Sequence, residues 1–150
     1  YYKTALGIFQ TKVPGEASVV LNNLGSTLKN LERYDEALDF LKKAYEVGEA
    51  RRNPLERLMP LNNQGYVYSI QGRYQEALQK HEEALRLAKQ ISAPEDELHA
   101  LRGIGNNMYR MGRYAEALDA FRSVVTVSEQ LKSPDGSASG HIGMGRCYEK

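Results

Sequence analysis

The sequence has little of what several classes of protein require. It holds a single cysteine, Cys147, in 150 residues, so no internal disulfide framework can form, which favours a cytoplasmic, intracellular location. The 20 Lys and Arg against 19 Asp and Glu leave a net charge of +1, which gives no overall attraction to nucleic acid or to an acidic membrane. No apolar run approaches the roughly 20 residues of a membrane span, and residues 1–10 lack the regions of a signal peptide. We therefore expect no membrane segment and no direct binding of nucleic acid.

Signals for catalysis and for bound cofactors are also missing. His81 is not part of a zinc-binding helix motif, and His99 and His141 have no ligand spacing around them. The glycine-rich run Gly103–Gly105 follows no strand, although a phosphate-binding loop requires one. Cys147 has no paired base in the sequence and is expected to be a buried, inert thiol. The sequence thus predicts no enzyme activity, no metal and no cofactor, with His81 packed in the core.

What the chain does have is an internal repeat. The hexapeptide Arg-Tyr-x-Glu-Ala-Leu begins at Arg33, Arg73 and Arg113, always 40 residues apart. Glycines at positions 25, 65, 105 and 145 and prolines at positions 14, 54, 94 and 134 keep the same spacing. The predicted division is a half-copy, three full repeats and a partial copy, which span residues 1–20, 21–60, 61–100, 101–140 and 141–150.

Each repeat has the hydrophobic periodicity of two helices. In the first full repeat, Leu21, Leu24 and Leu28 fall at the i, i+3 and i+7 positions of one helix face, and Ala37 and Leu41 do the same further on. No segment shows the alternation of a strand. We predict an all-α single array over residues 1–150, a fragment of a longer one. Residues 1–20 would be the second helix of a preceding repeat, and residues 141–150 the first helix of a further one.

Turn residues support this division into helices. Gly72 and Gly112 lie between paired helices, where a residue of positive φ is required, although Glu32 takes that place in the first repeat. Asn53-Pro54 and Ser133-Pro134 are typical of an N-cap followed by proline at the first helical position.

Two expectations concern the interior of the helices. Pro60 predicts a helix that is kinked or that begins late. Small side chains allow two helix axes to approach closely. The glycines of the first helices are expected to face alanines of the second helices, in the pairs Gly25 with Ala37, Gly65 with Ala77, and Gly105 with Ala117.

The spacing of small and aromatic residues resembles the tetratricopeptide repeat. In the second repeat the pattern is Gly65 and Tyr68, followed by Ala77 and Ala84. The unit is longer than the usual ~34 residues, and Leu21–Gly25 resembles the subgroup that includes kinesin light chains, Pins-type adaptors and bacterial regulators. The resemblance implies a right-handed superhelical solenoid of antiparallel helix pairs, with about three full repeats and partial repeats at both ends.

The resemblance also implies that a peptide or a partner protein binds in a concave groove lined by the first helices. Asparagine can both donate to and accept from a peptide backbone, and Tyr and Arg are frequent interface anchors. The candidate binding residues are Asn22, Asn23, Ser26, Lys29, Asn62, Asn63, Tyr66, Ser69, His99, Arg102, Asn106, Tyr109, Arg110 and Arg146. The same face is expected to include Val19, Asn30, Met59, Ile70, Gly103, Ser139, Ile142 and Glu149.

The chemistry of the partner is only partly indicated. The cationic residues of this face outnumber Glu149, which indicates an acidic partner segment near repeats three and four; they are Lys29, Arg102, Arg110 and Arg146. Asn22 stands where chaperone-tail-binding relatives have a lysine, which argues against chaperone C-termini. Two alternatives remain open, namely a regulatory module that controls an attached effector domain, and self-association through open repeat ends.

Overall fold

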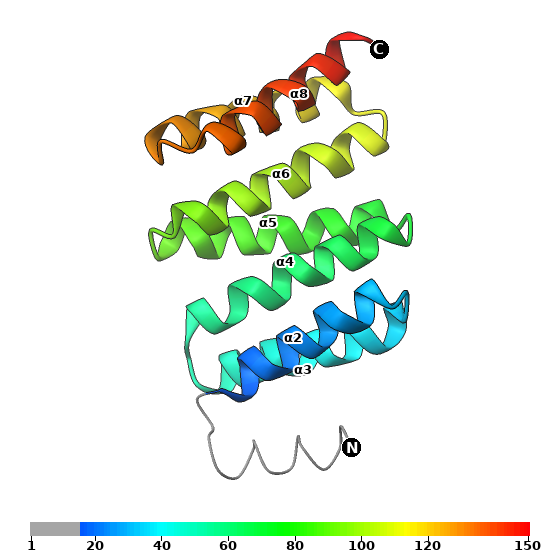
Figure 1. The fold of residues 1–150 in the computed structure, drawn as a ribbon, viewed down its shortest axis with the longest axis vertical. Helices are drawn as coiled ribbons and strands as arrows, with labels where there is room; N and C mark the ends of the chain where they lie inside the picture. The colour runs from blue at the N-terminus through cyan, green and yellow to red at the C-terminus, as the bar shows by residue number, and fades with distance from the viewer. Residues whose placement is uncertain (1–15) are drawn as a thin grey trace. The chain divides into compact units, whose positions relative to one another are not determined.

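The described part of the chain is entirely helical. The computed structural model describes residues 16–150, which contain seven α-helices and no strand (Figure 1). The helices are α2 (Ala17–Asn30), α3 (Tyr34–Ala50), α4 (Pro54–Ile70), α5 (Tyr74–Gln90), α6 (Pro94–Arg110), α7 (Tyr114–Gln130) and α8 (Pro134–Tyr148). None of these helices is long and apolar enough to cross a membrane. The predicted all-α repeat solenoid is confirmed, while the second helix predicted for residues 1–20 lies, up to residue 15, outside the described residues.

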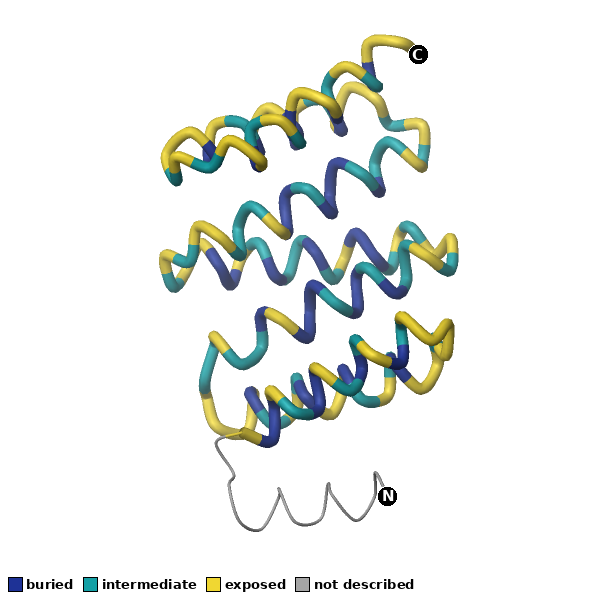
Figure 2. The backbone as a smooth tube through the Cα atoms, viewed as in Figure 1, coloured by how far each residue is buried: buried dark blue, intermediate teal, exposed yellow. Residues whose placement is uncertain are grey.

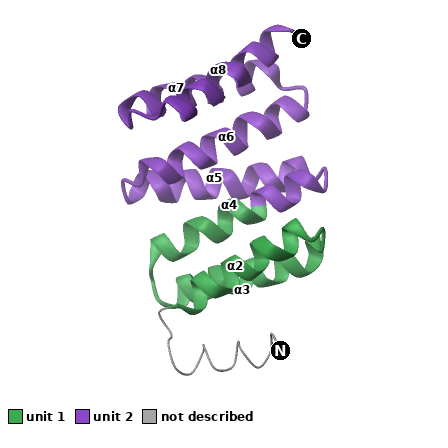
Figure 3. Ribbon diagram, in the orientation of Figure 1, with its two compact units in different colours: residues 1–64 green, residues 65–150 purple. Residues whose placement is uncertain are grey.

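The chain forms two compact units that meet within α4. Unit 1 contains residues 1–64 and unit 2 contains residues 65–150 (Figure 3). In unit 1, α2 packs against α3, and in unit 2 each helix from α5 to α8 packs against the next one. The first helices α6 and α8 of successive repeats also touch each other. α4, α6 and α8 begin at Pro54, Pro94 and Pro134, ahead of the proposed repeat boundaries at residues 61, 101 and 141.

The turns between the described helices all have the same backbone conformation. Each contains a single residue of positive φ, namely Glu32, Arg52, Gly72, Ser92, Gly112 and Lys132. The next amide donates to the carbonyl five residues earlier, as from Arg33 N to Leu28 O at 2.9 Å, which is the helix-ending Schellman motif. The positive φ predicted for Gly72 and Gly112 is confirmed. These turns are largely exposed (Figure 2).

The repeated hexapeptide has a local structural explanation. Arg33, Arg73 and Arg113 are the N-cap residues of α3, α5 and α7. The guanidinium of each donates to the glutamate three residues later, in Arg33 by bonds of 2.6 and 2.7 Å to Glu36. This hydrogen bond lowers the pKa of Glu36, as it does in the other two repeats. The Arg and Glu of the motif therefore pair with each other at the start of each second helix.

Large side chains lie nearest to the glycines of the first helices. A Cβ added at Gly25 would lie 2.6 Å from Leu41, and one at Gly65 would lie 2.6 Å from His81. The Ala37 carbonyl also lies 3.1 Å from the Cβ added at Gly25, which bears out the expected pair Gly25 with Ala37. The residue one turn beyond each alanine reaches back toward the helix start, because helical side chains lean toward the N-terminus.

The same arrangement recurs between neighbouring repeats of unit 2. The His81 ring lies against both Gly65 of α4 and Gly103 of α6, and the Phe121 ring lies against both Gly105 of α6 and Gly143 of α8. Each ring thus occupies the space left by two glycines on successive first helices.

Pro60 lies inside a continuous helix. α4 begins at Pro54, so the expected late start is wrong, and Asn53 Oδ1 accepts from the Leu55 amide at 3.2 Å. A proline has no N–H for the carbonyl four residues earlier, which here belongs to Glu56. The buried hydroxyl of Ser18 lies 3.2 Å from that carbonyl and 3.1 Å from the carbonyl of Ala44. Ser18 can therefore satisfy the acceptor that Pro60 leaves open.

Candidate partner-binding face

Unit 1 has an apolar hollow between two first helices. It is lined by Val19 of α2 and by Leu55, Met59 and Pro60 of α4, and has a volume of about 190 Å³. Val19, Leu55 and Met59 are all at least half exposed. The Asn63 side chain donates to Asn22 Oδ1 at 2.9 Å and joins the same two helices. We call this the unit 1 hollow.

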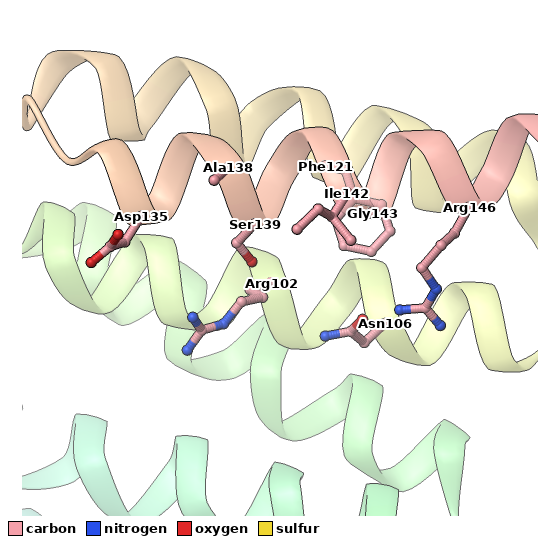
Figure 4. A pocket seen from close by; sticks show the side chains of 9 residues that line it. All are labelled: Arg102, Asn106, Phe121, Asp135, Ala138, Ser139, Ile142, Gly143 and Arg146. Atoms are coloured by element: carbon pink, nitrogen blue, oxygen red, sulfur yellow. The ribbon is translucent and has the colours of Figure 1, made fainter.

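Unit 2 has a hollow of different chemistry between α6 and α8. It has a volume of about 380 Å³ and is lined by Arg102 and Asn106 of α6 and by Ser139, Ile142 and Arg146 of α8, among others. Figure 4 shows the Asn106 amide between the two guanidinium groups. We call this the unit 2 hollow. It combines cationic groups with one large exposed apolar side chain, since Ile142 is 65% exposed.

Aromatic side chains contact both arginines of the unit 2 hollow. The Arg146 guanidinium stacks over the Tyr109 ring at 4.4 Å, and Tyr109 in turn packs against Tyr114 with ring centroids 5.4 Å apart. Arg102 Nη2 lies 3.1 Å from His99 Nδ1. Within residues 16–150, neither guanidinium has a carboxylate in ion-pair range. The two guanidinium groups are therefore held in position, and no carboxylate of the described residues pairs with their positive charge.

The predicted binding residues fall into two groups. Arg102, Asn106 and Arg146 come together in the unit 2 hollow, and Asn22 borders the unit 1 hollow. At least part of the surface is open to solvent in Asn23, Ser26, Lys29, Asn63, Tyr66, Ser69, His99, Arg102, Asn106, Tyr109, Arg110 and Arg146. Asn22 and Asn62 are buried and offer little surface to a partner.

Gly103 does not belong to the exposed face on which the sequence placed it. It is buried against His81, since a Cβ there would lie 2.5 Å from that ring. Leu55 was missed by the sequence reasoning, although it lies one helical turn before Met59 and therefore on the same side of α4. Asp135, which borders the unit 2 hollow, was missed as well. Pro60 left open whether the helix was kinked or began late, so Leu55 was not placed on this face.

The residues expected to be inert are packed in the interior. His81 is 0% exposed, and its burial lowers its pKa to about 4. Its ring meets Tyr66 edge-on with centroids 5.0 Å apart. Burial raises the pKa of the Cys147 thiol, which is also buried. His81 is therefore neutral and Cys147 protonated near pH 7.

Repeated helical pairs, each ended by the same turn, with open hollows between first helices, define a helical-repeat protein. The family model of the tetratricopeptide repeat matches residues 16–90 and again residues 56–130. The chain belongs to the tetratricopeptide repeat family. Repeats of this kind are generally non-catalytic modules for protein interaction. No curated protein matches the chain in sequence.

Solved structures share the fold at low sequence identity. Aspartyl phosphate phosphatase F from Bacillus subtilis is 17% identical, with a TM-score of 0.87 over 94% of this chain and 37% of that one. BtubC from P. vanneervenii is 16% identical, with a TM-score of 0.87 over 99% of this chain and 63% of that one. This chain thus spans less than two thirds of the length of either protein.

A third likeness concerns the expected subgroup. A kinesin light chain-type protein from Podospora anserina with nearly identical TPR-like repeats is 15% identical, with a TM-score of 0.76 over 98% of this chain and 74% of that one. The predicted resemblance to kinesin light chain-like repeats is confirmed at the level of the fold.

Proposed function

We propose that this chain is a binding module that captures a segment of a partner protein along its first helices. The segment occupies the unit 1 hollow and is acidic where it meets α6 and α8.

The distribution of exposed apolar side chains carries this proposal. Within residues 16–150, six of the eight large exposed apolar residues lie on first helices, namely Val19, Leu55, Met59, Ile70, Ile142 and Tyr148. Only Tyr114 lies on a second helix, and Leu31 lies in a turn. Exposed apolar groups that gather on one set of elements are typical of an interaction surface. Because the second helices α3, α5 and α7 carry one such group, Tyr114, the first helices are the better candidates.

A pair of matched leucines tests the proposal. Leu55 of the unit 1 hollow and Leu31 of the first turn are each 61% exposed. Peptides would be selected on the wild-type chain from a displayed library of random 12-residue sequences. Their affinities would then be measured for Leu55→Lys and Leu31→Lys. We expect Leu55→Lys to weaken binding about tenfold or more, as at a buried interface anchor, and Leu31→Lys to leave it unchanged.

Two results would contradict the proposal. One is a wild-type chain that selects no peptide at all, and the other is a selected peptide whose affinity falls with Leu31→Lys but not with Leu55→Lys. Thermal melts of both variants provide the control, because lysine at either exposed position should leave the fold intact.

A further inference from the structure

We propose that Met59 is an oxidation site, at which a peroxide changes the unit 1 hollow from an apolar surface to a polar one and so weakens partner binding. The inference rests on the proposed function and adds a means of control to it. With hydrogen peroxide, the thioether sulfur bonds to one peroxide oxygen and the O–O bond breaks, which gives methionine sulfoxide and water. The sulfur is oxidised and the peroxide is reduced, so the step needs no further reactant.

Exposure separates Met59 from the other three methionines of the chain. Met59 is 54% exposed, and it is the one methionine among the large exposed apolar residues of residues 16–150. Met108 and Met144 are partly buried and pack against the core of unit 2. Met111 is partly buried in the turn that follows α6. Because a peroxide must contact the sulfur to oxidise it, the most exposed thioether reacts first.

Met59 contributes directly to the apolar surface of the unit 1 hollow. Val19 of α2 and Leu55 of α4 border the same hollow, and each is at least half exposed. Leu55 lies one helical turn before Met59, on the same side of α4. In the next two repeats the position of Met59 is taken by His99 and Ser139. The apolar character of this hollow therefore depends on a side chain that the following repeats replace by polar ones.

A sulfoxide at position 59 would put a strong hydrogen-bond acceptor where the thioether was. The Ser18 hydroxyl, which also borders the hollow, already lies 3.1 Å from the carbonyl of Ala44 and 3.2 Å from that of Glu56. The sulfoxide oxygen would therefore depend on water for its hydrogen bonds. An apolar partner side chain that covered it would displace this water, and a buried polar group without a hydrogen bond is unfavourable. Oxidation should consequently weaken binding while the fold is retained.

The test compares peptide affinities before and after mild oxidation. Peptides without Met or Cys would be selected on the wild-type chain, which would then be treated with hydrogen peroxide, freed of it and measured again. Mass spectrometry of proteolytic fragments gives the oxidised fraction at each methionine. We expect Met59 to oxidise several times faster than Met108 and Met144. The affinity should fall about tenfold once Met59 is oxidised.

Three variants provide the controls. Met59→Leu, which nearly conserves the side-chain volume, should keep its own affinity through the treatment. Met111→Leu retains the thioether of Met59 and should lose affinity as the wild type does. Untreated Met59→Gln has a polar side chain at the site and should bind about tenfold more weakly than the untreated wild type. Thermal melts check that the oxidised chain and the variants remain folded.

Four results would overturn the inference. Met59 could oxidise no faster than Met108, or oxidise fully with the affinity retained. Wild type and Met59→Leu could lose affinity equally on treatment, or Met59→Gln could bind as tightly as the wild type. In each case, binding that still depends on Leu55 would leave the proposed function standing. A wild-type chain that selects no peptide would overturn both.

Discussion

His81 is a buried histidine in a position that Leu41 and Phe121 occupy in the other repeats. Its ring fills the space between Gly65 and Gly103, and burial lowers its pKa from 6.5 to about 4. Near neutral pH the neutral ring behaves as an aromatic core residue. The buried ring lowers the free energy of unfolding only at acidic pH, because the unfolded chain then binds a proton that the folded chain does not.

This gives a prediction for stability against pH. Since the folded pKa lies below the unfolded one, the stabilisation is complete above about pH 6.5 and is lost as pH falls toward 4. Between pH 7.5 and pH 5 the loss should be about 2 kcal/mol, from the shift and the usual free energy per pKa unit. Urea unfolding at the two pH values measures it.

His81→Phe is the matched control for that measurement. Phenylalanine should fit, because Phe121 occupies the same space between Gly105 and Gly143 in the next repeat. The variant should show a pH dependence smaller by about the same 2 kcal/mol, while His99 and His141 remain in both proteins. Equal pH dependence of wild type and His81→Phe would show that His81 does not carry the effect.

At the scale of the element, some glycines lie in turns at positive φ and others lie inside helices. Gly72 has a φ of +75°, and a Cβ there would meet nothing within 4 Å. Gly145 also has open space around it but lies inside α8. The two glycines therefore differ in backbone conformation alone.

The same substitution at these two positions should have opposite effects. Gly72→Ala should cost about 1 kcal/mol, because alanine is strained at positive φ. Gly145→Ala should stabilise by about 0.5–1 kcal/mol, because alanine favours a helix over glycine. Thermal unfolding of both variants measures the difference. A destabilised Gly145→Ala would mean that position 145 is not in an ordinary helical conformation.

A second prediction at this scale concerns Ser18 and Pro60. Ser18 can donate to the Glu56 carbonyl, which Pro60 cannot bond because it has no N–H. Ser18→Ala should cost about 1–2 kcal/mol, since it removes the donor near the Glu56 carbonyl. In a Pro60→Ala background the new amide of residue 60 can bond that carbonyl within the helix. The cost of Ser18→Ala should then fall by about 1 kcal/mol. Purely additive effects in this double-mutant cycle would contradict the proposed compensation.

The sequence predicted the elements better than the contacts between them. Period and turn residues located the helical pairs because those signals are local, as at Gly72 and Ser133-Pro134. Asn53-Pro54 predicted the start of α4, but Pro60 left a kink or a late start open. The donor near the Glu56 carbonyl is Ser18, which lies far away in the sequence. Likewise, periodicity placed Arg102 and Arg146 on exposed helix faces. It could not show that Arg146 stacks on Tyr109 and that Arg102 contacts His99.

At the scale of the molecule, the first and second helices carry different kinds of side chain. Second helices carry the Arg–Glu pairs and the large core residues Leu41, His81 and Phe121. First helices carry the glycines that admit those residues, together with most of the exposed apolar groups. Close packing lies on one side of the first helices, and we propose that partner binding uses the other side.

Hydrogen exchange with and without a peptide selected on the wild-type chain tests this central claim most directly. The account predicts that the peptide slows exchange in the first helices α2, α4, α6 or α8 at the hollows, and leaves the outward side of α3, α5 and α7 unchanged. Slower exchange confined to α3, α5 and α7, with none in the first helices, would contradict it.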